Sequence, residues 1–190
     1  MPTDRFALLR DKIEEIIKKS PLDFDLLHAR KVLEWVLKLK PSANETLQIA
    51  ALAHDMERGV TGIAETYGLK DLSNIKQFKK EHAKRSADII AEVMKKSDYS
   101  TEVIARVYFL VENHEAGGLD EDLNILMEAD SIAYFDGHVA NYFKKNGKTK
   151  TTDKVRFMYE RMSASAQQIV REMAYDQPEV KEIIIEVTGN

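Results

Sequence analysis

Hydrophobic residues recur along this chain mostly at intervals of three and four positions, which is the spacing of one face of an α-helix. Only 8 glycines and 4 prolines interrupt that pattern. Helices that each carry one apolar stripe must bury the stripes against one another. We therefore predict an all-α fold, a helical bundle without a substantial sheet.

Turn-forming and capping residues divide the pattern into segments. Ser20-Pro21 is expected to end the first helix, Asp23 or Asp25 to cap the second, and Ser42 or Asn44 to begin the third. The predicted helices span residues 4–19, 23–40, 42–58, 79–95, 100–114, 120–143, 154–175 and 178–187. Gly62 and Gly68 bracket a looser stretch, and the polar segment 144–153 is predicted to be a loop.

Length and composition restrict the classes of protein to consider. A chain of 190 residues suits one compact domain, here residues 1–190, and the absence of cysteine excludes disulfides and cysteine-ligated zinc. A net charge of -4 argues against a broad nucleic-acid interface. No apolar run approaches the roughly 18 residues of a membrane span. We expect a cytoplasmic protein with no membrane contact, and a homodimer is left open.

The dipeptide His54-Asp55 is the most informative local feature, because it lies at the end of the apolar run LQIAALAHDM. An imidazole nitrogen and a carboxylate oxygen are ligands that hold borderline or hard divalent ions. Burying both groups is costly unless a cation or hydrogen bonds compensate them. Taken alone, the pair also fits a histidine that is hydrogen-bonded to a carboxylate near a helix end.

Four further donor residues favour the metal interpretation over the isolated pair. His28, His82, His114 and Asp130 each lie on a different predicted helix, near its end or within its apolar stripe. A helical bundle builds a metal pocket from side chains on facing helices in this way. The segments that carry the donors are HARKV, AALAHDM, KKEHAKRSADII, LVENHE and LMEADSIAYFD.

In this order the segments resemble the HD superfamily of metal-dependent phosphohydrolases, and the resemblance covers about residues 22–143. It implies an HD-domain-like helical bundle with flanking helices at both ends. It implies that one divalent ion is coordinated by His28, His54, Asp55 and Asp130. It also implies that His82 and His114 add ligands for a second ion, so that one or two ions of Mn, Fe, Co, Ni, Zn or Mg are bound.

The chain departs from the family pattern just after the His-Asp pair. Many family members carry a water-activating glutamate four residues after that histidine, where this chain has Arg58, with Glu57 one residue earlier. Residues three and four apart share a helical face, so Glu57 remains a candidate catalytic residue beside Asp55. Arg58 is either a ligand for a substrate phosphate or a solvated arginine near a helix C-terminus.

Other polar and aromatic residues admit a structural interpretation beside a functional one. Lys80 and Arg85, close to His82, are candidate cations for a substrate phosphate, although charged runs on helices are usually solvated. His138 lies two helical turns beyond Asp130 and matches no family position, so we expect it at a pocket rim or in the core. We expect most of a set of aromatic residues to be core residues: Trp35, Tyr108, Phe109, Tyr134 and Phe135.

The resemblance implies a metal-dependent phosphohydrolase that acts on a small phosphate ester or nucleotide. The same donors could instead hold two irons, which would make the protein a di-iron oxygenase. A third interpretation, favoured by the glutamate that is out of register, is a non-catalytic regulator that binds a nucleotide or a metal without turnover.

Overall fold

The computed structural model describes residues 4–63 and 75–189, and every regular element within those ranges is a helix. In chain order the helices are α1 (Asp4–Ile17), α2 (Asp25–Leu39), α3 (Glu45–Ala53), α4 (Arg58–Thr61), α5 (Ile75–Lys95), α6 (Thr101–Asn113), α7 (Glu121–Gly137), α8 (Val139–Glu160), α9 (Ala164–Glu172) and α10 (Pro178–Thr188). The predicted all-α fold is confirmed for the described residues. A search of the same residues finds no helix that could cross a membrane.

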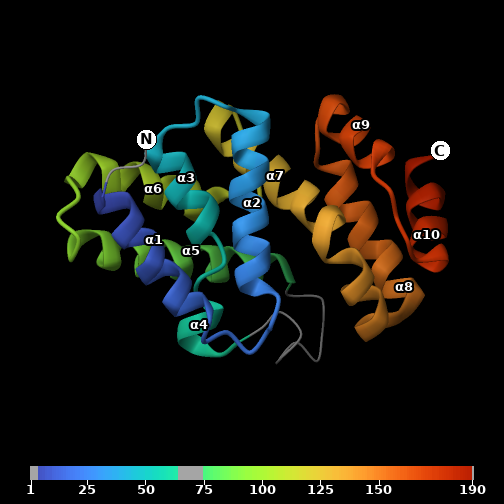
Figure 1. Cartoon of the computed structure of the whole chain (residues 1–190), viewed down its shortest axis with the longest axis horizontal. Coiled ribbons are helices and arrows are strands. Elements are labelled where there is room, and N and C mark those ends of the chain that lie inside the picture. The colour runs from blue at the N-terminus through green and yellow to red at the C-terminus, as the bar shows by residue number, and fades with distance from the viewer. Residues whose placement is uncertain (1–3, 64–74, 190) are drawn as a thin grey trace.

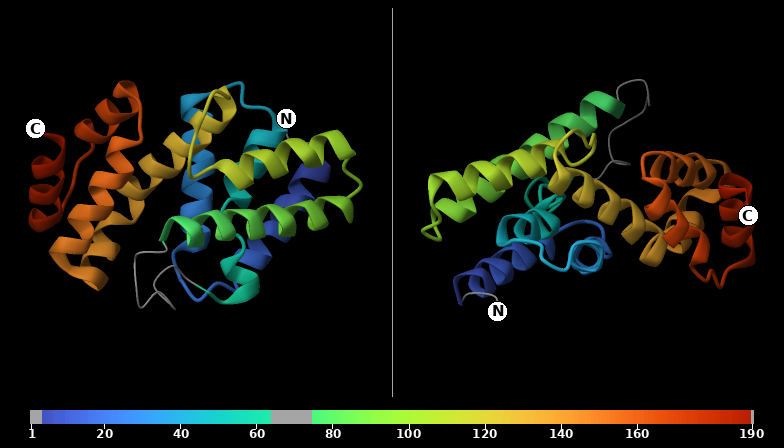
Figure 2. Two further views of the ribbon diagram at one scale, coloured as in Figure 1. Left: turned by 180° about the vertical axis from the view of Figure 1, so that it is seen from behind. Right: turned by 90° about the horizontal axis from the view of Figure 1, so that it is seen from above.

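The helices form two groups that α7 connects (Figure 1). Helices α1 to α6 lie on one side, with α5 packed along α6 and α2 packed against both α3 and α7. Helices α8 to α10 lie on the other side, where α10 packs on α8. Seen from behind and from above, the second group extends away from the first along α7 (Figure 2). The molecule is therefore elongated, and its two halves meet at α7.

Each half has its own hydrophobic cluster, and residues of α7 contribute to both. Ala129 and Ala133 belong to the larger cluster, whereas Ile132 and Phe135 belong to the smaller one. Trp35 of α2 packs against both clusters. Helix α7 is apolar around much of its circumference because other helices cover it on more than one side. A polar residue on α7 therefore lies at the boundary between the halves.

The capping residues are partly as predicted. Asn44 begins α3, and its side-chain oxygen accepts a hydrogen bond of 3.0 Å from the backbone N–H of Leu47. The predicted cap of α2 by Asp23 or Asp25 is wrong, because Phe24 occupies that position without a side-chain bond. Asp25 instead accepts a hydrogen bond from the Ser20 hydroxyl at 2.5 Å.

The largest corrections fall after residue 137. The single helix predicted over 120–143 is divided at His138, whose φ of -120° separates α7 from α8. The loop predicted over 144–153 is helical within α8, with one non-helical residue, Gly147, at φ 75° and ψ -179°. Burial explains this difference, because Thr151 is fully buried and Val155 lies in the smaller cluster. Tertiary packing here outweighs weak local helix propensity.

Further differences concern the C-terminal helix and the aromatic residues. The helix predicted over 154–175 is divided between α8 and α9, and Ser163 caps the second of these helices. Tyr134 and Phe135 are buried as expected, whereas Phe109 is 41% exposed. Of the two glycines expected to bracket a looser stretch, Gly62 ends α4, and Gly68 lies outside the described residues.

Gly59 allows α4 to approach α1 closely, and its substitution tests this packing. A β-carbon at Gly59 would lie 2.0 Å from the carbonyl oxygen of Ile16. Because a backbone atom cannot move aside cheaply, we expect Gly59→Ala to lower the free energy of unfolding by roughly 1 to 3 kcal/mol. Chemical denaturation followed by circular dichroism measures this loss.

The matched control is Gly137→Ala, since a β-carbon at Gly137 meets nothing within 4 Å. We expect this variant to equal or slightly exceed the wild type in stability, because alanine favours the helix more than glycine does. Equal stability of the Gly59→Ala protein and the wild type would contradict the close approach of the two helices.

Candidate metal centre

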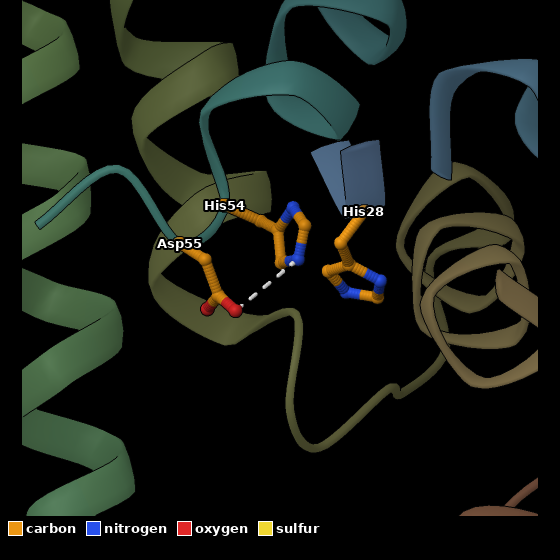
Figure 3. Close-up of side chains that lie close together, drawn as sticks. All are labelled: His28, His54 and Asp55. Atoms are coloured by element: carbon orange, nitrogen blue, oxygen red, sulfur yellow. Dashed lines mark ion pairs between the residues drawn. The ribbon is translucent and has the colours of Figure 1, made fainter. Parts of the chain in front are cut away.

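Three of the predicted ligands converge where α2 meets the end of α3 (Figure 3). His28 comes from α2, His54 follows the last residue of α3, and Asp55 is next in the chain. One donor atom from each of them lies within 4.8 Å of the other two. His54 Nε2 is 3.6 Å from Asp55 Oδ2. Bonds of about 2.0 to 2.2 Å to one ion require donor atoms at such separations.

Asp130 of α7 brings a fourth predicted ligand to the same point. Its Oδ1 atom is 2.9 Å from His28 Nε2 and 3.8 Å from His54 Nε2. The two imidazoles and two carboxylates predicted for a first ion thus lie close together, on α2, just after α3 and on α7. In this arrangement the N–H of His28 donates to Asp130, and an ion bound there would replace that proton.

A backbone hydrogen bond fixes the orientation of the His54 ring. Its Nδ1 atom is 2.9 Å from the carbonyl oxygen of Ala51, and since a carbonyl can only accept, Nδ1 carries the proton. The opposite nitrogen, Nε2, is buried and has no hydrogen-bond partner among the described residues. Burial lowers the pKa of His54 to about 4 despite the nearby carboxylates of Asp55 and Asp130. A neutral imidazole therefore presents its lone pair to the centre.

The two oxygens of Asp55 face different histidines. Oδ2 lies toward His54, whereas Oδ1 is 2.7 Å from His82 Nε2 and 3.9 Å from His114 Nε2. His114 is oriented as His54 is, because its Nδ1 donates to the carbonyl oxygen of Val111 at 2.7 Å. Both residues predicted to serve a second ion thus lie around Oδ1. Such an arrangement suits a carboxylate that bridges two ions.

His82 is held on both sides by carboxylates. Its Nδ1 atom is 2.8 Å from Glu57 Oε2, on the side opposite Asp55. Burial opposes a charge on His82, but the two carboxylates outweigh burial and raise its pKa to about 9. Glu57, fully buried, also accepts a hydrogen bond of 2.7 Å from Arg85 Nε. The Glu57 carboxylate therefore lies behind His82 and does not line the pocket that contains Asp55.

The three predicted substrate-binding cations have different positions. Arg58 is buried, lines the pocket, and contacts both Asp55 Oδ2 and, at 3.4 Å, Asp25 Oδ1. Burial acts to raise the pKa of Asp55, but Arg58 and the neighbouring imidazoles hold it well below its usual range. Lys80 is exposed, and Arg85 is directed to Glu57, so neither of them lines the pocket.

Two cations that the sequence analysis did not select lie at the centre. Arg161, which follows α8, contacts Asp130 Oδ2 at 2.5 Å and Glu115 Oε2 at 3.2 Å. Lys79 of α5 contacts the same Glu115 oxygen at 3.0 Å. Arg161 lies beyond the region of family resemblance, and Lys79 is one of four basic residues around His82. Nothing in their spacing distinguished them from solvated surface cations.

A pocket that is open to solvent adjoins the candidate ligands. His28, Asp55 and Asp130 line it, together with side chains of α8. Phe24 and His138 also line the pocket, with ring centroids 4.9 Å apart and ring planes tilted by 48°, and the His138 ring centroid is 4.8 Å from that of His28. Residues of both halves of the molecule therefore line the pocket, and three of the candidate metal ligands are among them.

Comparisons with known proteins add one finding. No curated protein and no solved structure matches the chain. A family model described as a domain of unknown function (DUF4202) matches residues 9–184. This match extends across both hydrophobic clusters and includes the helices beyond residue 143, which the motif resemblance does not cover. The chain therefore belongs to the DUF4202 family.

Proposed function

We propose that this protein is a metal-dependent phosphohydrolase that acts on a small phosphate ester or nucleotide. The observation that carries the proposal is the convergence of His28, His54, Asp55 and Asp130 beside an open pocket. The order of these residues along the chain is also the order on which the HD resemblance rests.

The donor atoms fit a divalent ion chemically. The buried Nε2 of His54 has no hydrogen-bond partner among the described residues, and an ion would use its lone pair. His28, Asp55 and Asp130 would complete the set around one ion. When bound, the ion supplies a lowered pKa for a coordinated water and polarisation of a phosphoryl oxygen.

The remaining residues position these donors and the substrate. Glu57 holds His82 from behind, so its proposed role is to orient that imidazole and not to accept a proton from water. Arg58 lies at the pocket surface beside Asp55, where its guanidinium can turn toward a phosphate oxygen. Arg161, which follows α8, forms an ion pair with Asp130 and so balances the charge of its carboxylate.

The test compares the wild type with an Asp55→Asn variant of the full chain, supplied with Mn²⁺ or another divalent ion. Because Asp55 is the central donor, we expect the variant to lose bound metal. Its phosphatase rate should fall by roughly 100-fold or more, since the ion contributes several kcal/mol of transition-state stabilisation. Elemental analysis and a panel of phosphate esters and nucleotides measure both quantities. Circular dichroism establishes that the variant is folded.

Asp23→Asn is the matched control, because Asp23 is exposed and lies outside the pocket. It should keep both metal and activity. Hydrolysis by Asp55→Asn at the wild-type rate with full metal occupancy would contradict the proposal. Oxygen consumption by an iron-loaded wild type would favour the di-iron oxygenase, and tight nucleotide binding without turnover would favour the regulator.

A second experiment separates one ion from two. His82 and His114 surround Asp55 Oδ1, and the His82→Ala, His114→Ala double variant removes both imidazoles. We expect two ions per chain in the wild type and one in the variant. The second ion must displace the proton that His82 shares with Asp55, so it should also be the first to be lost on dilution. An unchanged single ion would assign both histidines to the support of Asp55.

A further inference from the structure

One face of α7 extends from the candidate metal centre into the pocket. Asp130, Tyr134 and His138 are four residues apart, so their side chains follow one another on that face, and all three line the cavity. Each step of four residues advances about 6 Å along a helix. A molecule whose phosphate lies at Asp130 therefore extends past the Tyr134 and His138 side chains.

Tyr134 and His138 carry polar atoms whose hydrogen-bonding capacity is unused. Both residues are 5% exposed. Within the described ranges, the Tyr134 hydroxyl and both ring nitrogens of His138 have no hydrogen-bond partner. Leaving a buried polar group unpaired costs about 1 to 3 kcal/mol, so such groups in a pocket indicate that something else pairs with them.

The surroundings of His138 keep its ring in place without using its nitrogens. Phe24 and His28 pack against the ring, with centroids 4.9 Å and 4.8 Å away. A buried, neutral imidazole offers one donor and one acceptor, and a tyrosine hydroxyl can act as either. A hydroxyl group on a ligand has the same double capacity, so it can pair with Tyr134 and with either nitrogen of His138.

Charge on the facing wall favours an anionic ligand. Lys145 and Lys154 of α8 line the same cavity. The Lys154 ammonium lies 5.9 Å from the centre of the Tyr134 ring, and it helps to lower the pKa of Glu115. A ligand that extends from Asp130 along α7 thus passes between uncharged hydrogen-bonding groups and two lysines.

We propose that Tyr134 and His138 are specificity residues that bind hydroxyl groups on the alcohol part of a phosphate ester, so that the site takes a polyhydroxylated ester, such as a sugar phosphate. This inference rests on the proposed function, since it places the phosphate at the candidate metal centre. It assigns a role to Tyr134 of α7 and to His138, which follows α7, beyond the metal ligands that the resemblance implies.

The test uses two phosphonates that cannot be hydrolysed and differ only in hydroxyl groups, 3,4-dihydroxybutylphosphonate and butylphosphonate. Isothermal titration of the Mn²⁺-supplied full chain measures both affinities. We expect the dihydroxy compound to bind roughly 10-fold more tightly, which corresponds to one or two net hydrogen bonds. His138→Phe should abolish this preference and Tyr134→Phe should reduce it, while butylphosphonate affinity stays unchanged.

Phenylalanine at residue 138 keeps the ring packing and removes unpaired polar atoms, so we expect an unchanged or higher melting temperature. Tyr108→Phe is the matched control, because its hydroxyl bonds to Asp88 outside the pocket, and it should leave the preference intact. Equal affinities in the wild type, or a preference that survives both pocket variants, would overturn the assignment.

These experiments distinguish failure of the specificity proposal from failure of the proposed hydrolase function. A wild type that distinguishes the phosphonates but hydrolyses no phosphate ester would support the roles of Tyr134 and His138 and contradict the proposed hydrolase. A wild type that hydrolyses esters but binds both phosphonates equally would support the hydrolase and contradict the specificity residues. Failure of the dihydroxy phosphonate to bind would also count against the inference.

Discussion

The partly buried carboxylate of Asp55 is the group on which the arrangement of the N-terminal half depends. A carboxylate removed from water is costly unless cations or hydrogen-bond donors surround it. Here its Oδ1 atom accepts from His82, its Oδ2 atom contacts Arg58, and the rings of His54 and His114 complete the shell. These partners come from α4 and α5 and from the residues that directly follow α3 and α6, so the four helices must meet at this point for the charge to be stabilised.

The same kind of compensation joins the C-terminal half to the centre. Asp130 is balanced by His28 on one oxygen and by Arg161 on the other, and Arg161 also contacts Ser131 and Glu115. Hydrophobic packing of α8 on α10 positions the segment that carries Arg161. A substitution in the smaller hydrophobic cluster can therefore affect the charge balance at Asp130, although none of the cluster residues is a candidate metal ligand.

The sequence allowed the helical pattern to be predicted, because the periodicity of apolar residues is a local property. The order of His28, His54, Asp55 and Asp130 indicated that these side chains lie close together, whereas their binding of an ion stays a prediction. It did not allow the position of Glu57 to be predicted. That residue follows α3 in a tight turn, where its direction depends on α5, 25 residues further along the chain. The prediction of a loop at 144–153 was wrong for a related reason, since Thr151 is fully buried on α8, a helix that packs against α10. Contacts between residues far apart in sequence determine the conformation at such positions, and the spacing of residues along the chain does not reveal those contacts.

The candidate metal ligands and the other pocket residues differ in how far the sequence restricts them, so the substrate is harder to predict than the type of reaction. Donor residues for an ion must be histidine or carboxylate, so the sequence restricts them to a few positions. The facing wall comes from α8 and the end of α7, where tyrosine, histidine and lysine are also ordinary structural residues. Only burial distinguishes Tyr134 and His138, because the same side chains at a solvated position would bond to water at no cost. The proposed specificity therefore rests on which polar atoms are buried without partners, a property that is defined only when both halves of the molecule are folded together.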